Sequence, residues 1–514
     1  MMKVVDAAGP VEPGRGMMAV TALTQETVAA LPREVAVPSY DRSRLTAGIV
    51  HVGVGGFHRA HQAMYLDRLM NDGLAHDWAV CGVGVLPGDA RMRDALDAQD
   101  GLYTLVQKHP DGTLEARVIG SIVGFLFAPD DPQAVVEKMA DPAVRIVSLT
   151  VTEGGYNFHP VTGEFVADAP AVRADLEPGA APATVFGLVT EALRRRRARG
   201  VAPFTVMSCD NIQGNGDVAR RSFTAFARLA DADLAGWIEE AVAFPNSMVD
   251  RITPVTTDQD RASVAERFGV LDAWPVTCEP FTQWALEDHF SSGRPPFEAA
   301  GVQMVADVEP YELMKLRLLN AGHQALAYFG RLSGHRYVHE AATDAALARF
   351  VRDYMDVEAT PTLRPVPGVD LEDYKRTLIE RFANPEVRDT VARLCAESSD
   401  RIPKWLLPVV REQLARGGEV TRAAAVVASW ARYAEGVDEA GEPITIVDPL
   451  KDRLTPIART QRTRPTAFIE NRDLFGDLAD DKRFVEPYLR ALESLHTRGA
   501  RATVRELAEL GRRT

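Results

Sequence analysis

Three features of the sequence predict an α/β protein in two parts. Apolar, strand-like runs alternate with helical stretches in the first part of the chain, which is typical of a doubly wound, mostly parallel sheet. After about residue 305 the apolar residues recur at helical spacing instead. At 514 residues, the chain is too long for one ordinary core. We therefore predict an α/β domain over 46–304 and a mostly α-helical C-terminal domain over 305–514, preceded by a poorly ordered leader over 1–45.

The first predicted strand covers residues 48–53 and runs directly into the glycines Gly53, Gly55 and Gly56. A helix is expected from about 60 to 70. Strand, glycine turn and helix form the Rossmann-type unit that holds a pyrophosphate against helix N–H groups, with Phe57 and His58 at the cofactor edge. Because His58 replaces the third glycine of GxGxxG, a tight turn without a ligand stays open as the alternative.

Further strands are predicted over 78–85, 144–153 and 203–211, with a helix over 184–197 between the last two. In this fold an acid after the second strand binds the adenosine ribose, and Asp89 is the nearby acid. Asp89 favours NAD. NADP is the alternative, since Arg91 and Arg93 follow closely and could meet a 2′-phosphate.

The C-terminal domain is predicted from apolar residues at helical spacing. One such series runs from Leu371 to Phe382 and another from Val485 to Leu495. No internal repeat or long low-complexity tract interrupts this part of the sequence.

Charge, hydropathy and cysteine usage argue against several classes of protein. The formal net charge of −14 makes nonspecific nucleic-acid binding unfavourable, and the Arg194–Arg199 cluster is interpreted as the solvated end of a helix. No apolar run approaches the roughly 18 residues of a membrane span. The four cysteines form no CxxC pair, so buried free thiols in the reducing cytoplasm fit better than disulfides or a cysteine zinc site.

The stretch KLRLLNAGH, residues 315–323, places three chemically useful side chains on one predicted helix. At about 100° per residue, Lys315, Asn320 and His323 share one face and span roughly 12 Å. Any one of them alone would be ordinary, as a surface lysine, a capping asparagine or a core histidine. Together they can supply a base, an alkoxide-stabilising amide and a positioning group beside a nicotinamide, because desolvation and neighbouring donors lower the pKa of a partly buried lysine toward neutral.

Two further polar residues end predicted strands. Glu153 is the last residue of the strand SLTVTE, and Asn211 is the last residue of VMSCDN. Because the carboxyl ends of strands border the ligand crevice of an open α/β sheet, Asn211 is a candidate second alkoxide donor and Glu153 a candidate proton relay near Lys315. Each could equally be a loop cap.

Six segments carry a family resemblance: GVGGFHRAHQ (53–62), SLTVTEGGY (148–156), FTVMSCDNIQGNG (204–216), FPNSMVDRITP (244–254), CEPFTQW (278–284) and KLRLLNAGH (315–323). In this order they resemble the polyol-specific long-chain dehydrogenases, the mannitol dehydrogenase family, over nearly the whole chain from about residue 46.

The resemblance implies a zinc-independent enzyme whose active site lies between a Rossmann-type domain and a helical domain. It assigns Lys315 as the general base, Asn211 and Asn320 as the pair that stabilises the alkoxide, and His323 as a substrate-positioning residue. Asp250 matches a family residue that lines the cofactor and substrate site.

The resemblance leaves the substrate less defined. The family includes mannitol, arabinitol and related polyol dehydrogenases as well as fructuronate and tagaturonate reductases. Arg393 and Arg401 could bind either polyol hydroxyls or a uronate carboxylate, and the mannitol-type enzymes typically carry Lys at the position of Arg401. We expect NAD-dependent oxidation of D-mannitol to D-fructose and its reversal, by a monomer or small homo-oligomer without a metal. A hexuronate reductase is the main alternative, and a non-catalytic dinucleotide sensor the remote one.

Overall fold

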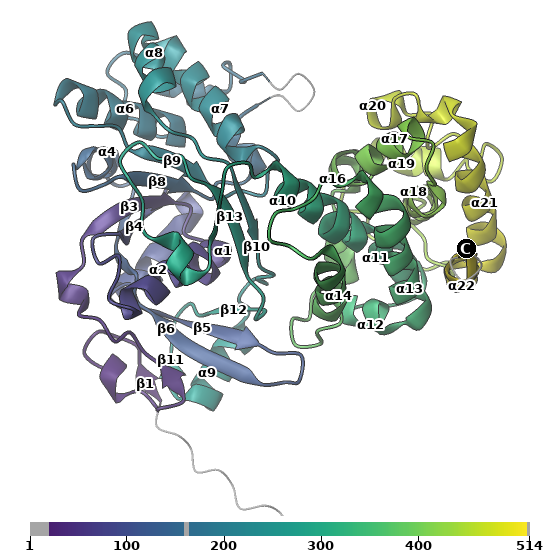
Figure 1. Cartoon of the computed structure of the whole chain (residues 1–514), viewed down its shortest axis with the longest axis horizontal. Coiled ribbons are helices and arrows are strands. Elements are labelled where there is room, and N and C mark those ends of the chain that lie inside the picture. The colour runs from purple at the N-terminus through teal and green to yellow at the C-terminus, as the bar shows by residue number, and fades with distance from the viewer. Residues whose placement is uncertain (1–19, 159–163, 511–514) are drawn as a thin grey trace, which may run out of the picture.

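A five-stranded parallel sheet forms the centre of the N-terminal domain in the computed structural model, which describes residues 20–158 and 164–510 (Figure 1). The strand order is β7-β4-β3-β8-β9, with β3 in the middle. The strands are β3 Ala47–Val52, β4 Ala79–Gly84, β7 Ile122–Phe127, β8 Ile146–Leu149 and β9 Thr205–Ser208. The predicted parallel, doubly wound sheet is confirmed.

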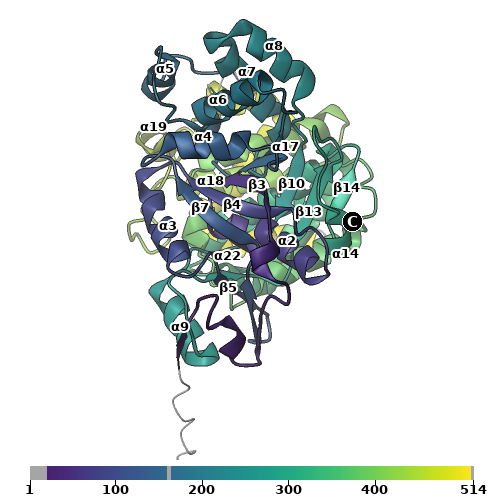
Figure 2. The ribbon, with the colours of Figure 1, turned by 90° about the vertical axis from the view of Figure 1, so that its left-hand side faces the viewer.

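Both faces of this sheet are covered because its strands are apolar on both sides. Val50 and Val52 face one core with helices α4 Pro132–Ala140, α6 Val185–Ala198 and α7 Asn215–Ala230. Ile49 faces the other core, with helices α2 Gln62–Asn71 and α3 Ala90–Asp97. Figure 2 shows α4 and α6 above the strands and α2 and α3 below them. Fully buried parallel strands read as continuous apolar runs, which is why the sequence revealed them.

Three smaller sheets surround the central one. A four-stranded sheet has the order β12-β5-β6-β2 and a three-stranded sheet the order β10-β13-β14. Their strands are β2 Val35–Ala36, β5 Tyr103–Lys108, β6 Leu114–Ile119, β10 Ser247–Asp250, β12 Val276–Cys278, β13 Gln283–Glu287 and β14 Gln303–Val305. The third is a two-stranded sheet, β1 Thr21–Ala22 with β11 Val270–Leu271, next to helix α9 Asp258–Phe268. The carboxyl ends of β10 and β12 lead to the candidate site.

The predicted leader is wrong from residue 20 onward. Residues 20–45 add β1 and β2 to two of the smaller sheets, and Leu23 is buried in a core of its own with Val270. Arg42 ties the segment down by donating to the carbonyls of Gly120 and Ile122. The order of residues 20–45 could not be predicted from local sequence because the contacts that hold them are long-range. Residues 1–19 lie outside the described part of the chain.

From Glu309 onward every named element of the described chain is helical, in a second lobe beside the first (Figure 1). The helices that matter for the site are α10 Glu309–Met314, the π-helical segment Lys315–Asn320, α11 Ala321–Leu332, α14 Leu371–Phe382, α15 Val391–Leu394 and α16 Ser398–Trp405. The rest include α12 Val338–Thr343, α13 Ala345–Asp353, α17 Leu407–Ala415, α18 Thr421–Tyr433, α19 Lys451–Ala458, α21 Lys482–Arg498 and α22 Ala500–Leu510. One large apolar core joins them.

Other sequence-based interpretations agree with the structure. All four cysteines are free and buried. The Arg194–Arg199 cluster ends α6, where Arg195 and Arg199 pair with Glu137. The interpretation of this cluster as solvated is wrong for Arg196, which is buried and donates to the carbonyls of Met139, Asp141 and Val144. Among the described residues, no helix combines the length and apolar character that crossing a membrane requires.

Candidate active site

The segment KLRLLN is a π-helix rather than an α-helix. The amide of Ala321 donates to the carbonyl of Leu316, five residues back, and α11 follows directly. The calculation at 100° per residue is therefore wrong between Lys315 and Asn320, because each π turn holds more residues. All three predicted side chains are nevertheless buried, with exposed fractions of 8% for Lys315, 6% for Asn320 and 8% for His323.

Lys315 reaches from the helical domain to the N-terminal domain. Its Nζ donates to Asn211 Oδ1 at 2.7 Å and to the carbonyl of Val249 at 2.5 Å. Burial lowers the pKa of Lys315 below its ordinary value, and Asp250 and Glu312 act against that shift. Burial also raises the pKa of Glu312, which lines the same surface pocket as Lys315 and Asn211, to about 7. Because burial disfavours the ammonium form, Lys315 loses its proton at a lower pH than an exposed lysine does.

Asn320 and His323 each keep a buried polar atom without a partner. Asn320 Nδ2 and His323 Nε2 have no hydrogen bond within the protein. The ring of His323 stacks on Phe382 at 4.0 Å, and burial lowers the pKa of His323 to about 3, so it is neutral at pH 7. A buried polar atom without a partner is costly unless a ligand supplies one. Both side chains are therefore suited to bind substrate oxygen.

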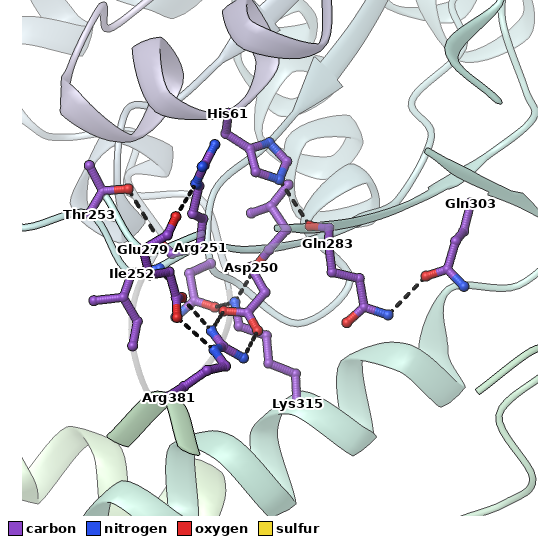
Figure 3. A network of polar contacts seen from close by, with 12 residues as sticks. His61, Asp250, Arg251, Ile252, Thr253, Glu279, Gln283, Gln303, Lys315 and Arg381 are labelled. Atoms are coloured by element: carbon purple, nitrogen blue, oxygen red, sulfur yellow. Dashed lines mark hydrogen bonds and ion pairs between the residues drawn. The ribbon is translucent and has the colours of Figure 1, made fainter. Parts of the chain in front are cut away.

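Asp250 ends strand β10 beside Lys315, and both of its oxygens are bound by Arg381 of α14 (Figure 3). The two contacts measure 2.8 and 3.0 Å. Arg381 also binds both oxygens of Glu279, at 2.9 and 2.7 Å. Burial works to raise the pKa of Asp250, but Arg381 more than offsets it, so the pKa of Asp250 is lowered. For Glu279 burial prevails, and its pKa is raised.

Sequence reasoning missed Arg381 and Glu279. Glu279 lies within the segment CEPFTQW but carried no signal of its own. Arg381 stands seven residues after Tyr374 and three after Leu378, on the stripe interpreted as core. A charged residue on an apolar stripe was the signal available. Tyr374 also belongs here, because its buried hydroxyl has no partner and lies in the fields of Asp250 and Arg381.

The two arginines predicted to bind substrate, Arg393 and Arg401, both already have partners within the protein. Arg393 pairs with Asp389, four residues earlier on the chain. Arg401 donates to the carbonyls of Arg393 and Leu394 and pairs with Glu397. Arg393 still lies near the site, since its charge acts on His323.

The backbone of Glu153 opens a short 3-10 helix, Glu153–Tyr156, after strand β8, while its side chain lies outside the described part of the structure. The loop before it is well anchored. Asp210 accepts from the amides of Val151 and Thr152 at 3.1 and 2.7 Å, and Tyr156 donates to the same carboxylate at 2.7 Å. Asp210 precedes Asn211, so this network links the two strand ends that sequence analysis singled out.

The glycine turn after β3 is tight at Gly53 and open at Gly55. Gly53 has φ +91°, and an added Cβ would lie 2.2 Å from the carbonyl oxygen of Thr150. At Gly55 an added Cβ would meet only the Gly53 oxygen, at 3.9 Å, so the space above it is open. Phe57 is half-buried against His61. The ring of His58 instead lies in the interior, stacked at 3.4 Å on His51 of β3, so only its backbone can border the turn.

Asp89 ends a short 3-10 helix, Pro87–Asp89, in the loop after β4. Its Oδ2 accepts from the amides of Val85 and Leu86, both at 2.9 Å, which shapes the loop after the strand. Arg91 lies over the ring of Trp274, and Arg93 pairs with Asp94 and Asp130. Both arginines therefore already have partners. In the described residues no group of three His, Cys, Asp or Glu side chains is placed to hold a metal ion.

Comparison with known proteins identifies the family. The model of the mannitol dehydrogenase Rossmann domain matches residues 47–299, and that of the mannitol dehydrogenase C-terminal domain matches 307–496. The chain is 49% identical over 480 residues to mannitol 2-dehydrogenase of Phaeosphaeria nodorum. The matched residues cover 93% of this chain and 84% of the relative.

Two solved structures resemble the whole chain. One is Pseudomonas fluorescens mannitol 2-dehydrogenase in a ternary complex with NAD and D-mannitol, at 45% identity and a TM-score of 0.86, covering 95% of this chain and 100% of that one. The other is a D-sorbitol dehydrogenase in substrate-free form, at 38% identity and a TM-score of 0.86, covering 94% and 100%. On these grounds the chain belongs to the mannitol dehydrogenase family.

Proposed function

We propose that this chain catalyses the NAD-dependent oxidation of a polyol, D-mannitol to D-fructose, and the reverse reduction. One observation carries the proposal. A buried lysine held by neutral acceptors lies on the same helical segment as two buried polar atoms without partners, Asn320 Nδ2 and His323 Nε2. The family membership of the chain supports the same reaction.

In the proposed reaction Lys315, in its neutral form, takes the proton of the substrate hydroxyl. Asn320 Nδ2 and the amide of Asn211 donate to the alkoxide that develops, and His323 Nε2 holds a substrate oxygen. NAD, when bound, supplies the acceptor for the hydride from the same carbon. The open turn at Gly55 and the carboxylate of Asp89 are the groups that would hold its pyrophosphate and ribose. Glu153 is proposed as a relay for the proton released by Lys315.

A polyol fits better than a hexuronate. A uronate carboxylate needs a cation that is free to bind it, but Arg393 and Arg401 are already paired with Asp389 and Glu397. Mannitol is the first choice because the relatives with that name match nearly the whole chain. Sorbitol is the substrate to test beside it, given the similar D-sorbitol dehydrogenase.

The test is steady-state turnover of the purified chain. NAD reduction is followed with mannitol, sorbitol and arabinitol, and NADH oxidation with fructose and fructuronate, each with the NADP form in parallel. We expect mannitol and fructose with NAD or NADH to give the highest kcat/KM. Preferred turnover of fructuronate would move the chain to the hexuronate reductases. NADH binding without turnover of any of these compounds would indicate the non-catalytic sensor.

A further inference from the structure

The buried triad Asp250, Arg381 and Glu279 connects the two domains directly beside Lys315. Arg381 comes from helix α14 of the C-terminal domain, while Asp250 ends strand β10 and Glu279 directly follows strand β12 of the N-terminal domain. The side chains of all three are almost fully buried, at 5%, 5% and 2% exposure. Arg381 also stacks on Phe281, 3.9 Å from the ring centre. An ion cluster this deep costs desolvation free energy, so its position beside the base needs an explanation.

Asp250 is the carboxylate that could neutralise Lys315. The lysine Nζ binds the carbonyl of Val249, the residue directly before Asp250, and the charge of Asp250 acts on it. Yet the lysine hydrogen bonds go to Asn211 and Val249 and not to that carboxylate. Both oxygens of Asp250 are turned to the guanidinium group instead, as Figure 3 shows.

We propose that Arg381 is a positioning residue that binds both oxygens of Asp250 and thereby keeps this carboxylate from pairing with the Lys315 ammonium group. The inference rests on the proposed function, in which Lys315 is the base. Glu279 holds Arg381 in place through the other side of the guanidinium group. A planar guanidinium group can bind both oxygens of each of two carboxylates at once, whereas the three donors of a lysine cannot reach all four oxygens.

The consequence concerns the pH at which Lys315 works. An opposite charge within hydrogen-bonding range shifts a pKa by about 1–3 units toward the charged form. If Asp250 were released, it would raise the pKa of Lys315, and the neutral base would become available only at higher pH. Arg381 opposes this twice, by binding Asp250 and by its own positive charge, which lowers the pKa of Lys315. Besides the triad of Asp250, Glu279 and Arg381, the charged or titratable groups around Lys315 are Arg251, Glu312, His61, His323 and Tyr374.

Two matched double variants separate this role from a simple change of charge. R381Q/E279Q and R381Q/D250N each remove the arginine and one carboxylate, so both keep the formal charge of the triad at −1, the sum for one arginine and two carboxylates. Only R381Q/E279Q leaves Asp250 free to pair with Lys315. Both variants avoid leaving two buried carboxylates without a cation, which favours folding.

The measurement is the pH dependence of kcat/KM for mannitol oxidation, with thermal melting and NADH titration as checks on folding. The wild-type profile comes first, and a chain that turns over no polyol at any pH refutes the proposed function itself. In the wild type, kcat/KM should rise with pH as Lys315 loses its proton, and this rise is the limb assigned to Lys315. Given wild-type turnover, we expect the limb to move to higher pH by about one unit or more in R381Q/E279Q. In R381Q/D250N it should stay near the wild-type position.

An unmoved limb in R381Q/E279Q, or equal shifts in the two variants, overturns the inference while leaving the proposed function intact. Should either double variant fail to fold, R381K provides the test. Its ammonium group retains the charge, but its three donors cannot bind all four carboxylate oxygens. R381K is expected to move the limb upward, and a wild-type profile there contradicts the role of Arg381.

Discussion

Replacing Lys315 by Met should abolish most of the activity without destabilising the protein. Met fills the same space but cannot take a proton. A general base contributes roughly 10²–10⁴-fold to the rate. The nearby histidines His61 and His323 are poor substitutes, because burial lowers the pKa of each to about 3. We therefore expect kcat/KM for mannitol to fall about 10³-fold, or about 4 kcal/mol at 1.36 kcal/mol per factor of ten.

The stability of the same variant should move in the opposite direction. Since the pKa of Lys315 is lower in the folded than in the unfolded chain, the unfolded chain binds the proton more tightly. Lys315 therefore destabilises the protein below its folded pKa, and this penalty fades as the pH rises toward the ordinary value of 10.5. K315M removes the penalty. Its Tm should equal or exceed that of the wild type at pH 7, and the difference should shrink as the pH rises toward 10.5.

Lys375 provides the matched control, since its side chain is also buried, at 2% exposure, but pairs with Asp356 and Glu372. K375M should lower Tm and leave the pH profile of kcat/KM unchanged. The assays are NAD reduction from pH 6 to 10, thermal melting over the same range and NADH titration. Should K315M keep more than about a tenth of wild-type kcat/KM at every pH, Lys315 is not the base.

Three further outcomes are expected. N320A removes the donor that has no partner in the protein and should lower kcat for mannitol about 10²–10³-fold with NADH affinity unchanged; a lower affinity alone would contradict the alkoxide role. D89N keeps an oxygen for the amides of Val85 and Leu86 but loses the negative charge. NADH titration should therefore show binding weakened about 10- to 100-fold, while NADPH binding should not be weakened. An equal loss of affinity for both cofactors would contradict a ribose contact. G53A and G55A form a matched pair. G53A should lower Tm because its Cβ clashes with Thr150, whereas G55A should melt like the wild type but bind NADH poorly. Normal NADH affinity in G55A would place the pyrophosphate elsewhere.

Local patterns in the sequence were sufficient for the parallel sheet, the glycine turn and the helical C-terminal domain. Buried parallel strands such as β3 and β8 are continuous apolar runs, and the helices from α14 onward show their apolar stripes directly. The segment carrying Lys315, Asn320 and His323 was recognisable for a similar reason, because three polar groups stand close together on a chain otherwise rich in Leu and Ala.

Tertiary structure decided the rest, because the decisive contacts join residues far apart in the sequence. The π turn at Lys315–Asn320 replaces the geometry that the sequence spacing suggested. Asp250 and Arg381 are separated by 131 positions, so no local pattern shows that the carboxylate beside the base is already bound. The partners of Arg393 and Arg401 and the ordered strands within residues 20–45 likewise appear only when the chain is folded. Burial and pairing set how each charged group titrates, and both depend on the three-dimensional arrangement of the whole chain.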